Sequence, residues 1–375
     1  MRALLHRPGR LLTSALVMSG LAVASLAVPN APLTSRAQAA GSTTTVGPGA
    51  NLKAAMMALQ PGDTLALLPG VYDTGLVAPT PATAPGPTVD AKGTVKKMSN
   101  GTRTAPITVR AADQGNRPLI RGEIKLWGPS YWVLDGLRVQ SVDAGRDALY
   151  IGGGTGWVVR NSEFFGARST GAYSNVTISG DIYGTGAPRA FTFTGNCVRD
   201  AGQTTRKGTD HNIYVSFAGA SGSGGVISKN VIFNHRNGAG IKLGNGGVPG
   251  ARGPWGVKVV YNTIAQGGRQ VLLHGDVRNN TIARNIFATS TQRFSGANKT
   301  TSVYLNNVVG GGNTFLNNYA TSSTMFSWGK TARVGVDNAV RTNPRFSGVG
   351  CGAFRPTFAK AAAYGRYGSG ALPRW

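Results

Sequence analysis

The alternation of apolar and polar positions predicts short strands along most of the chain. Between residues 135 and 285 one phrase recurs six times: an apolar strand, a single polar residue that is usually Asn, and a second apolar strand. The polar residues are Asp135, Asn161, Asn196, Asn230, Asn262 and Asn285, so successive steps are 26, 35, 34, 32 and 23 residues. A period of about 20–35 residues that contains only strands indicates a solenoid.

Asn at each bend is expected to serve two purposes. It tolerates the left-handed backbone of a tight bend, and its amide can hydrogen-bond to the same position in the coils above and below. We therefore predict an all-β fold, a right-handed parallel β-helix over residues 41–342. An antiparallel sandwich rich in Asn turns is the alternative, but hairpin signals such as Asn-Gly between equal strands are scarce.

The two ends of the solenoid are predicted to be covered. Asn51 can cap a short helix whose Leu52, Ala55, Met56 and Leu59 form one apolar stripe. Such a helix protects the unpaired strand edges at the open end of a β-helix. Residues 343–375 are expected to form a tail that packs on the last coils, and residues 79–104, rich in Pro and Lys, a basic loop.

The first forty residues have the pattern of a signal peptide. Three early Arg residues precede an apolar run from residue 11 to residue 28, and Ala37-Gln38-Ala39 supplies a small-x-small cleavage pattern. The alternative is a membrane anchor, since the apolar run is rather long. We predict a secreted, monomeric protein that has no membrane segment after cleavage.

The composition supports strands and an oxidising compartment. The chain has 55 Gly, and its only Glu residues are Glu123 and Glu163, which disfavours helices. Cys197 directly follows a bend residue and Cys351 lies in the tail. In an exported chain this pair can form a disulfide that fixes the tail to the solenoid, or it can remain as two buried thiols.

The formal net charge is +25, and removing the four Arg residues at positions 2, 7, 10 and 36 leaves +21. Such a charge attracts polyanions. We expect an acidic polysaccharide as the partner and no nucleic acid, because no basic helix with interleaved aromatics, zinc spacing or other nucleic-acid module is present. The charge can also serve only solubility or attachment to an anionic cell wall.

Several phrases resemble the opening coils of secreted right-handed β-helix polysaccharide lyases, the pectate-lyase-like group that includes alginate lyases and chondroitinase B. They are QPGDT and PGVY within residues 60–72, APITVR (105–110), PLIRG (118–122) and WVLDGL (132–137), with NPRF (343–346) and GAFRP (352–356) resembling the closing segment. The resemblance covers the mature chain and is more specific for fold than for activity.

The strands that precede the bends place a set of side chains on one face. Leu149/Ile151, Ile213/Val215, Ile241/Leu243 and Val271/Leu273 align as inward positions, so their neighbours point outward. The outward columns read Tyr150, Tyr214, Lys242, Leu272; then Gly152, Ser216, Gly244, His274; then Ala148, Asn212, Gly240, Gln270. The strand entries and preceding loops carry Arg146, Asp147, Arg206, Lys207, Asp210, His211, His235, Arg236 and Arg269.

This face has the parts that β-elimination of a uronic-acid polymer requires: cations that neutralise the carboxylate, a base for the C5 proton and a proton donor for the leaving oxygen. We predict Lys242 as the base, because surrounding cations favour its neutral amine, with His211 as the competing base. Tyr214 or His211 would protonate the leaving oxygen. The predicted substrate-binding residues are Arg146, Tyr150, Asn212, Arg206, Lys207, Arg236, His235 and His274.

The resemblance implies a Lys and an Arg on neighbouring coils, which Lys242 and Arg269 match. It also implies, for several members, a calcium ion held by a Glu-x-Glu or carboxylate cluster, which this chain lacks. Asp210 is a weak candidate ligand, so we expect no cofactor, with calcium as the less favoured alternative.

Two other functions stay open. Glycoside hydrolysis needs two facing carboxylates and is less favoured, because the acids near the face are Asp147 and Asp210. A noncatalytic solenoid that only grips an acidic polymer would carry the same residues in structural roles, with Tyr214 stacked on Tyr150 and Lys242 as a solvated charge.

Overall fold

Contacts divide the chain into residues 1–39 and 40–375, and the computed structural model describes part of the second unit. The described residues are 41–79, 98–143, 145–167, 174–180, 186–202, 210–245, 251–288, 301–321, 326–327, 333–334, 339–340 and 343–369. The predicted signal peptide, most of the predicted basic loop, and Arg206 and Lys207 lie outside these ranges. Among the described residues, no helix has the length and hydropathy to cross a membrane.

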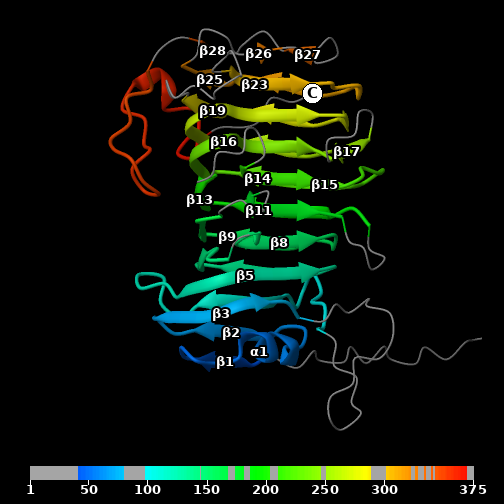
Figure 1. The fold of residues 1–375 in the computed structure, drawn as a ribbon, viewed down its shortest axis with the longest axis vertical. Helices are drawn as coiled ribbons and strands as arrows, with labels where there is room; N and C mark the ends of the chain where they lie inside the picture. The colour runs from blue at the N-terminus through cyan, green and yellow to red at the C-terminus, as the bar shows by residue number, and fades with distance from the viewer. Residues whose placement is uncertain are drawn as a thin grey trace, which may run out of the picture. The chain divides into compact units, whose positions relative to one another are not determined.

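The described strands form a parallel β-helix, as predicted, in which every paired strand runs parallel to its neighbour (Figure 1). One sheet has eleven strands. In spatial order they are β1 (Thr43–Val46), β2 (Thr64–Leu67), β4 (Ile107–Ala111), β6 (Trp132–Asp135), β9 (Val158–Arg160), β12 (Arg189–Thr194), β15 (Gly224–Ser228), β18 (Lys258–Val260), β21 (Thr281–Ala283), β24 (Thr314–Leu316) and β27 (Arg333–Val334).

The other main sheet has fifteen strands and folds around a corner, so that each coil presents three strand faces. Its strands are β3 (Val71–Val77), β5 (Leu119–Trp127), β7 (Arg138–Gln140), β8 (Leu149–Gly152), β10 (Glu163–Phe165), β11 (Ser174–Ser179), β13 (Cys197–Ala201), β14 (His211–Ser216), β16 (Val231–Gly244), β19 (Thr263–His274), β22 (Ile286–Ala288), β23 (Thr301–Asn306), β25 (Tyr319–Ala320), β26 (Phe326–Ser327) and β28 (Ala339–Val340). A separate pair joins β17 (Arg252–Trp255) to β20 (Asp276–Arg278).

The long strands show how the corner divides this sheet. The first half of β16 pairs with β13 and its second half pairs with β14. We call the face formed by β8, β11, β14, β23 and the second halves of β5, β16 and β19 the candidate face. The face formed by β7, β10, β13, β22 and the first halves of the long strands is called the tail face.

Apolar side chains stack inside the solenoid in register. Leu134, Val159, Phe193, Ile227 and Val259 pair from one coil to the next along the eleven-stranded sheet, and each is no more than 1% exposed. Burying each such side chain contributes roughly 1.5–3 kcal/mol. Because the side-chain period of a strand is two, this stack fixes which residues of every coil face outward.

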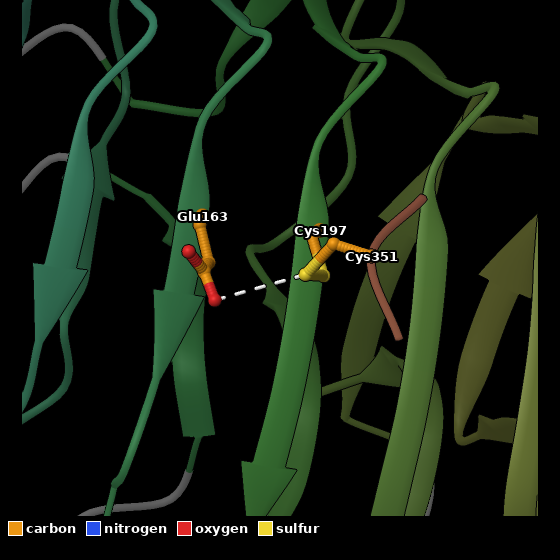
Figure 2. Close-up of side chains that lie close together, drawn as sticks. All are labelled: Glu163, Cys197 and Cys351. Atoms are coloured by element: carbon orange, nitrogen blue, oxygen red, sulfur yellow. Dashed lines mark hydrogen bonds between the residues drawn. A yellow bond between two sulfur atoms is a disulfide. The ribbon is translucent and has the colours of Figure 1, made fainter. Parts of the chain in front are cut away.

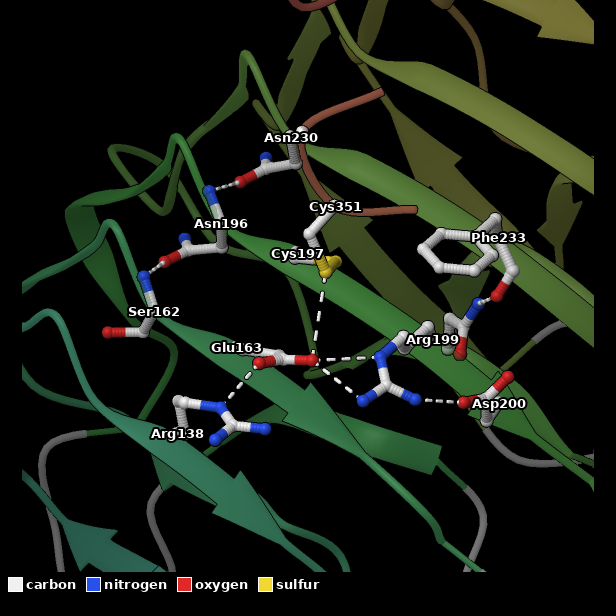
Figure 3. Close-up of a disulfide and its surroundings, with 12 residues drawn as sticks. Arg138, Ser162, Glu163, Asn196, Cys197, Arg199, Asp200, Asn230, Phe233 and Cys351 are labelled. Atoms are coloured by element: carbon white, nitrogen blue, oxygen red, sulfur yellow. Dashed lines mark hydrogen bonds and ion pairs between the residues drawn. A yellow bond between two sulfur atoms is a disulfide. The ribbon is translucent and has the colours of Figure 1, made fainter. Parts of the chain in front are cut away.

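The predicted Asn column exists, but it starts at Ser162 rather than at Asp135 and Asn161, and it extends to Asn318. The ladder runs through Ser162, Asn196, Asn230, Asn262, Asn285 and Asn318, each backbone N–H donating to the next amide oxygen at 2.8–3.1 Å. Asp135 and Asn161 lie outside it and bond to each other at 3.0 Å. Figure 3 shows the steps from Asn230 to Ser162.

The left-handed conformation falls one residue earlier than predicted. Positive φ values occur at Asn161, Gly195, Lys229, Tyr261, Arg284 and Asn317, each of which precedes a ladder residue. The ladder Asn residues are fully buried, and their amides bond inward. At each bend, therefore, one residue adopts the left-handed conformation and the next residue, the ladder residue, makes the hydrogen bond between coils.

The predicted cap helix is present as α1 (Leu52–Ala58). The Asn51 side chain accepts a hydrogen bond from the Ala54 N–H at 3.0 Å. Leu52, Met56 and Leu59 are buried in the main core, and Figure 1 shows α1 beside β1 and β2. The amphipathic stripe thus covers the first coil, as the sequence predicts.

The tail packs on the tail face and is covalently attached to it. Cys197 of β13 and Cys351 form a disulfide with a Cα–Cα distance of 5.4 Å (Figures 2 and 3). Phe354 lies 5.1 Å from Phe233 between ring centroids, in a cluster that also contains Val231. The structure therefore selects the disulfide over two free thiols. The tail also contains a short 3₁₀ helix, η1 (Ala359–Ala361).

Glu163 lies next to this disulfide and interacts with several arginines. Arg138 and Arg199 each donate to its carboxylate at 2.8 Å, and Arg117 lies 3.6 Å away. Burial would raise the pKa of Glu163, but the hydrogen bonds from Arg138 and Arg199 outweigh it and lower the pKa. Cys351 Sγ lies 3.7 Å from Glu163 Oε1; a disulfide sulfur has no proton to donate, so this is a close S···O contact.

Candidate functional site

The candidate face carries one outward column that crosses seven strands. Its members pair in register from β5 to β23. In order they are Lys125, Tyr150, Thr177, Tyr214, Lys242, Leu272 and Tyr304. Parallel strands lie about 4.8 Å apart, so the column continues across the coils at that spacing.

The predicted register is confirmed where it was drawn. Ile213, Ile241 and Val271 pair with one another and are completely buried, which leaves Tyr214 and Lys242 as outward neighbours. Sequence reasoning passed over β11, which lies between β8 and β14. Thr177 therefore separates Tyr150 from Tyr214, and the stacking of these two tyrosines that the noncatalytic alternative assumed does not occur.

Lys242, Tyr214 and His211 form a compact cluster at the centre of the face. Lys242 Nζ lies 4.5 Å from the centroid of the Tyr214 ring, a cation–π geometry. The His211 ring lies 5.6 Å from the Tyr214 ring between centroids. The three predicted catalytic residues from β14 and β16 thus lie together, with Tyr214 between the other two.

The hydrogen bond of His211 fixes its tautomer. His211 is buried, and its Nδ1 accepts a hydrogen bond from the Ala239 N–H at 2.9 Å. Burial lowers the pKa of His211 well below its ordinary value of 6.5, and the positive charge of Lys242 lowers it further. The ring is therefore neutral with its proton on Nε2, so Nε2 donates a hydrogen bond rather than accepting a proton.

His274 has the opposite tautomer. Its Nδ1 lies 3.0 Å from the Asn306 carbonyl oxygen, which can only accept, so Nδ1 carries the proton. Nε2 then presents a lone pair, and it has no hydrogen-bonding partner among the described residues. Burial lowers the pKa of His274, as does Lys242. Gly244, the register partner of His274, makes room for it, because a Cβ there would lie 2.8 Å from the His274 Cβ.

Arg269 lies at the entry of the same face. Its guanidinium carbon is 4.4 Å from the centroid of the Tyr304 ring. Burial lowers the pKa of Arg269, although a guanidinium stays charged in proteins. Arg269 is thus a fixed cation two strands away from His211, on the side of Lys242.

Two predicted substrate-binding residues are excluded from the surface. Asn212 is fully buried; its Nδ2 donates to the Phe233 carbonyl at 2.8 Å, and its amide oxygen accepts from Asn175. His235 is also fully buried and packs on Gly267, where a Cβ would come within 1.9 Å of the ring. Burial lowers the pKa of His235 to about 4. Asn212 links neighbouring strands at the corner of the solenoid, and both side chains are too deep to touch a polymer.

The remaining predictions concern ligands and cations. Asp210 is 2% exposed. Across the described ranges, the one group of three potential metal ligands is Glu163, Cys197 and Cys351, and its two cysteines are joined in the disulfide, so they offer no thiolate. Arg206, Lys207 and the Arg236 side chain lie outside what the structure describes.

The face also contains residues that sequence reasoning missed. Lys125 and Trp127 of β5 belong to the outward columns, and Glu123 precedes them in the same strand. The signal was the alternation of Ile120, Ile124 and Leu126, which are all buried. Applying the inward–outward rule to this strand would have found Lys125 and Trp127.

Asp147 is the most perturbed acid on the face. It accepts a hydrogen bond from the Ser174 N–H at 3.3 Å. Burial raises its pKa to about 7, against a hydrogen bond from Thr177, and the negative charge of Glu123 raises it further. Glu123 itself lies 3.8 Å from Arg146, and burial raises its pKa. Glu123 is therefore an acid whose charge acts on Asp147.

The fold and the candidate face together define a parallel β-helix protein with a cationic, aromatic-lined face. No protein-family model matches the chain, and no curated protein matches it. Solved structures with a similar fold include an alginate lyase from Paenibacillus sp. str. FPU-7, with 16% identity, a TM-score of 0.41, and coverage of 80% of this chain and 98% of that one.

Two further structures show the same kind of similarity. Pectate lyase Pel9A has 17% identity and a TM-score of 0.37, covering 77% of this chain and 78% of that one. The A-module of the mannuronan C-5 epimerase AlgE4 from Azotobacter vinelandii has 13% identity and a TM-score of 0.35, covering 79% and 100%. The parallel β-helix predicted from the sequence is shown by the strand pairing of this chain itself, and its activity has to be argued from its own residues.

Proposed function

We propose that the protein is a polysaccharide lyase that cleaves a uronic-acid polymer by β-elimination. The observation that carries this proposal is the contact of Lys242 with Tyr214 on the candidate face, with the neutral imidazole of His211, which is only 1% exposed, packed against Tyr214. Arg269 adds a fixed cation to that face. These groups can supply charge neutralisation, a base and a proton donor to a single sugar.

The reaction needs only groups of this kind. A base removes the proton on C5, next to the sugar carboxylate, and the electrons of that C–H bond form the C4–C5 double bond. The C4–O bond then breaks, and the leaving oxygen takes a proton. A cation beside the carboxylate stabilises the negative charge that develops when the C5 proton departs. The step consumes no oxidant, reductant or water.

The tautomer of each histidine indicates whether it can act as a hydrogen-bond donor or as a base. His211 Nε2 carries a proton, so His211 is assigned as a buried hydrogen-bond donor within the cluster, and Lys242 is assigned as the base, a role it can take once it has released its own proton to solvent. Tyr214 contacts Lys242 and His211, and we assign it the protonation of the leaving oxygen. Arg269 is assigned to the sugar carboxylate, where a guanidinium binds in two-point fashion. His274 Nε2 is the competing base.

The substrate class follows from charge. A net charge of +21 after removal of the first forty residues favours acidic over neutral polymers. Such polymers occur outside cells, in keeping with the predicted signal peptide, so we place the protein among secreted enzymes. The competing proposal is a noncatalytic binder, favoured by the 8% exposure of Tyr214, since a tyrosine covered by Lys242 can serve packing alone.

Incubation with alginate, pectate, chondroitin and hyaluronan tests the proposal. Elimination alone creates an unsaturated uronate, whose ultraviolet absorbance grows with each cut. We expect growth with one of these polymers and none with a neutral glycan. New reducing ends without that absorbance would establish hydrolysis instead. Binding without any cleavage would establish the noncatalytic alternative.

A further inference from the structure

A second cation–aromatic cluster lies at the other end of the outward column. Lys125 Nζ is 4.5 Å from the centroid of the Tyr150 ring and 5.3 Å from that of Trp127. The Trp127 and Tyr150 rings are 4.9 Å apart at an interplanar angle of 55°. The distance from lysine to tyrosine is the same 4.5 Å as between Lys242 and Tyr214.

The two clusters share one column and mirror each other. Register places Lys125, Tyr150, Thr177, Tyr214 and Lys242 on five consecutive strands. The order of side chains is therefore Lys, Tyr, Thr, Tyr, Lys, centred on Thr177. Four steps of about 4.8 Å put the two lysines about 19 Å apart along the sheet.

The sequence makes room for this cluster. The Trp127 ring lies over Gly152, where a Cβ would come within 2.4 Å of the ring. Lys125, Trp127 and Tyr150 are each partly exposed. Within the described part of the chain, Lys125 makes no salt bridge, although its charge acts on Glu123 and Asp147 and opposes the rise in their pKa caused by burial. Lys125 lies over the two rings and is partly exposed, so a ligand can reach its charge.

We propose that Lys125, Trp127 and Tyr150 form a second binding subsite for an acidic sugar, so that one polymer lies across the strands and contacts both clusters. The proposal rests on the proposed function for the class of polymer and adds its course and minimum length. Aromatic rings offer an apolar surface to a sugar ring, and Lys125 offers a charge to its carboxylate. Two subsites on one chain bind cooperatively only if the ligand spans both.

Binding of oligosaccharides of increasing length tests this arrangement by calorimetry. The probes are oligomannuronates and oligogalacturonates, and the protein carries Tyr214→Phe, which removes the proposed proton donor so that no probe is cut and keeps both lysines and the aromatic ring. We expect affinity to rise in a step once the oligomer spans about 19 Å. Lys125→Ala should remove that step, which is about tenfold or more in Kd, and leave short oligomers unchanged.

Lys258→Ala is the matched control, because it removes one exposed lysine from β18 of the other sheet. Lys125→Met keeps most of the apolar stem beside Trp127 and guards against a folding defect, which circular dichroism detects. Loss of the step in both Lys125 variants, with Lys258→Ala unchanged, supports the subsite. Equal affinities of Lys125→Ala and Lys258→Ala at every length overturn it, as does a failure of all probes to bind.

The two proposals fail in different ways. A length-dependent step in a protein that never produces an unsaturated uronate would sink the elimination and leave the subsite standing. Elimination by the wild-type protein, with affinity independent of oligomer length, would sink the subsite and leave the elimination standing.

Discussion

Replacing Asp147 by Asn should stabilise the protein at neutral pH. Burial raises the pKa of Asp147 from 3.8 to about 7, so the folded state favours the protonated acid. Its contribution to stability is complete below pH 3.8 and is lost as the pH rises through about 7. The difference of about three pKa units corresponds to at most about 4 kcal/mol, at 1.36 kcal/mol per unit. Asn cannot ionise and avoids this loss.

Urea unfolding of wild type and Asp147→Asn from pH 4 to pH 8 measures the effect. The two should be within about 1 kcal/mol of each other at pH 4, and the variant should be more stable by ~2–4 kcal/mol at pH 8. Burial lowers the pKa of His211 and His235, which destabilises the fold below their ordinary pKa of 6.5, but both groups are present in both proteins and cancel. Asp113→Asn, at an exposed position, is the control. A stability difference that does not change with pH would refute the burial argument.

Three further outcomes follow from the fold and the charge. Asn262→Leu leaves two N–H donors of Asn230 and one carbonyl unpaired, so it should lower the free energy of unfolding in urea by roughly 3–6 kcal/mol. Asn161→Gly, which lies outside the ladder, should cost under about 1 kcal/mol. Equal losses in the two variants would contradict a stabilising role of the ladder. Binding to an acidic matrix should weaken steeply with salt, since screening acts over about 8 Å at physiological ionic strength, and equal retention on neutral and acidic matrices would contradict it. Reduction of the Cys197–Cys351 disulfide, which closes 154 residues, should cost up to about 5 kcal/mol and expose the tail to protease; an unchanged unfolding midpoint would show that the tail is held by packing alone.

Most of the fold could be predicted because the same residue types recur at the same position of each coil. The recurring Asn residues mark the bends, and the alternation of Ile213 and Val215 fixes the inward face of β14. The start of the ladder could not be predicted, because Ser162 replaces Asn there and Asn161 stands one residue earlier. A single sequence does not reveal that the Ser162 hydroxyl, which accepts a hydrogen bond from the Leu137 N–H, takes the place of an amide oxygen.

The candidate site was predicted in part. Tyr214 and Lys242 lie together because the register of two neighbouring strands decides their contact. Asn212 and His235 were placed on the surface in error, because polarity suggested exposure. Asn212 is buried because its amide satisfies the Phe233 carbonyl at the corner, and His235 is buried because its ring packs on Gly267. Which nitrogen of His211 carries the proton depends on a backbone N–H of the next coil, and the sequence cannot show that contact.

The turnover of Lys242→Ala, measured by the absorbance of the unsaturated product on whichever polymer the wild type cleaves, tests the proposed mechanism most directly. Loss of a positioned base should reduce turnover roughly a hundredfold or more. Polymer binding should fall much less than turnover, by about the tenfold expected for Lys125→Ala, because Arg269 and the second subsite remain, and Lys258→Ala should match the wild type in both measurements. Near-normal turnover by a folded Lys242→Ala variant would contradict the assignment and move the base to another group on the face, with His274 the first to examine.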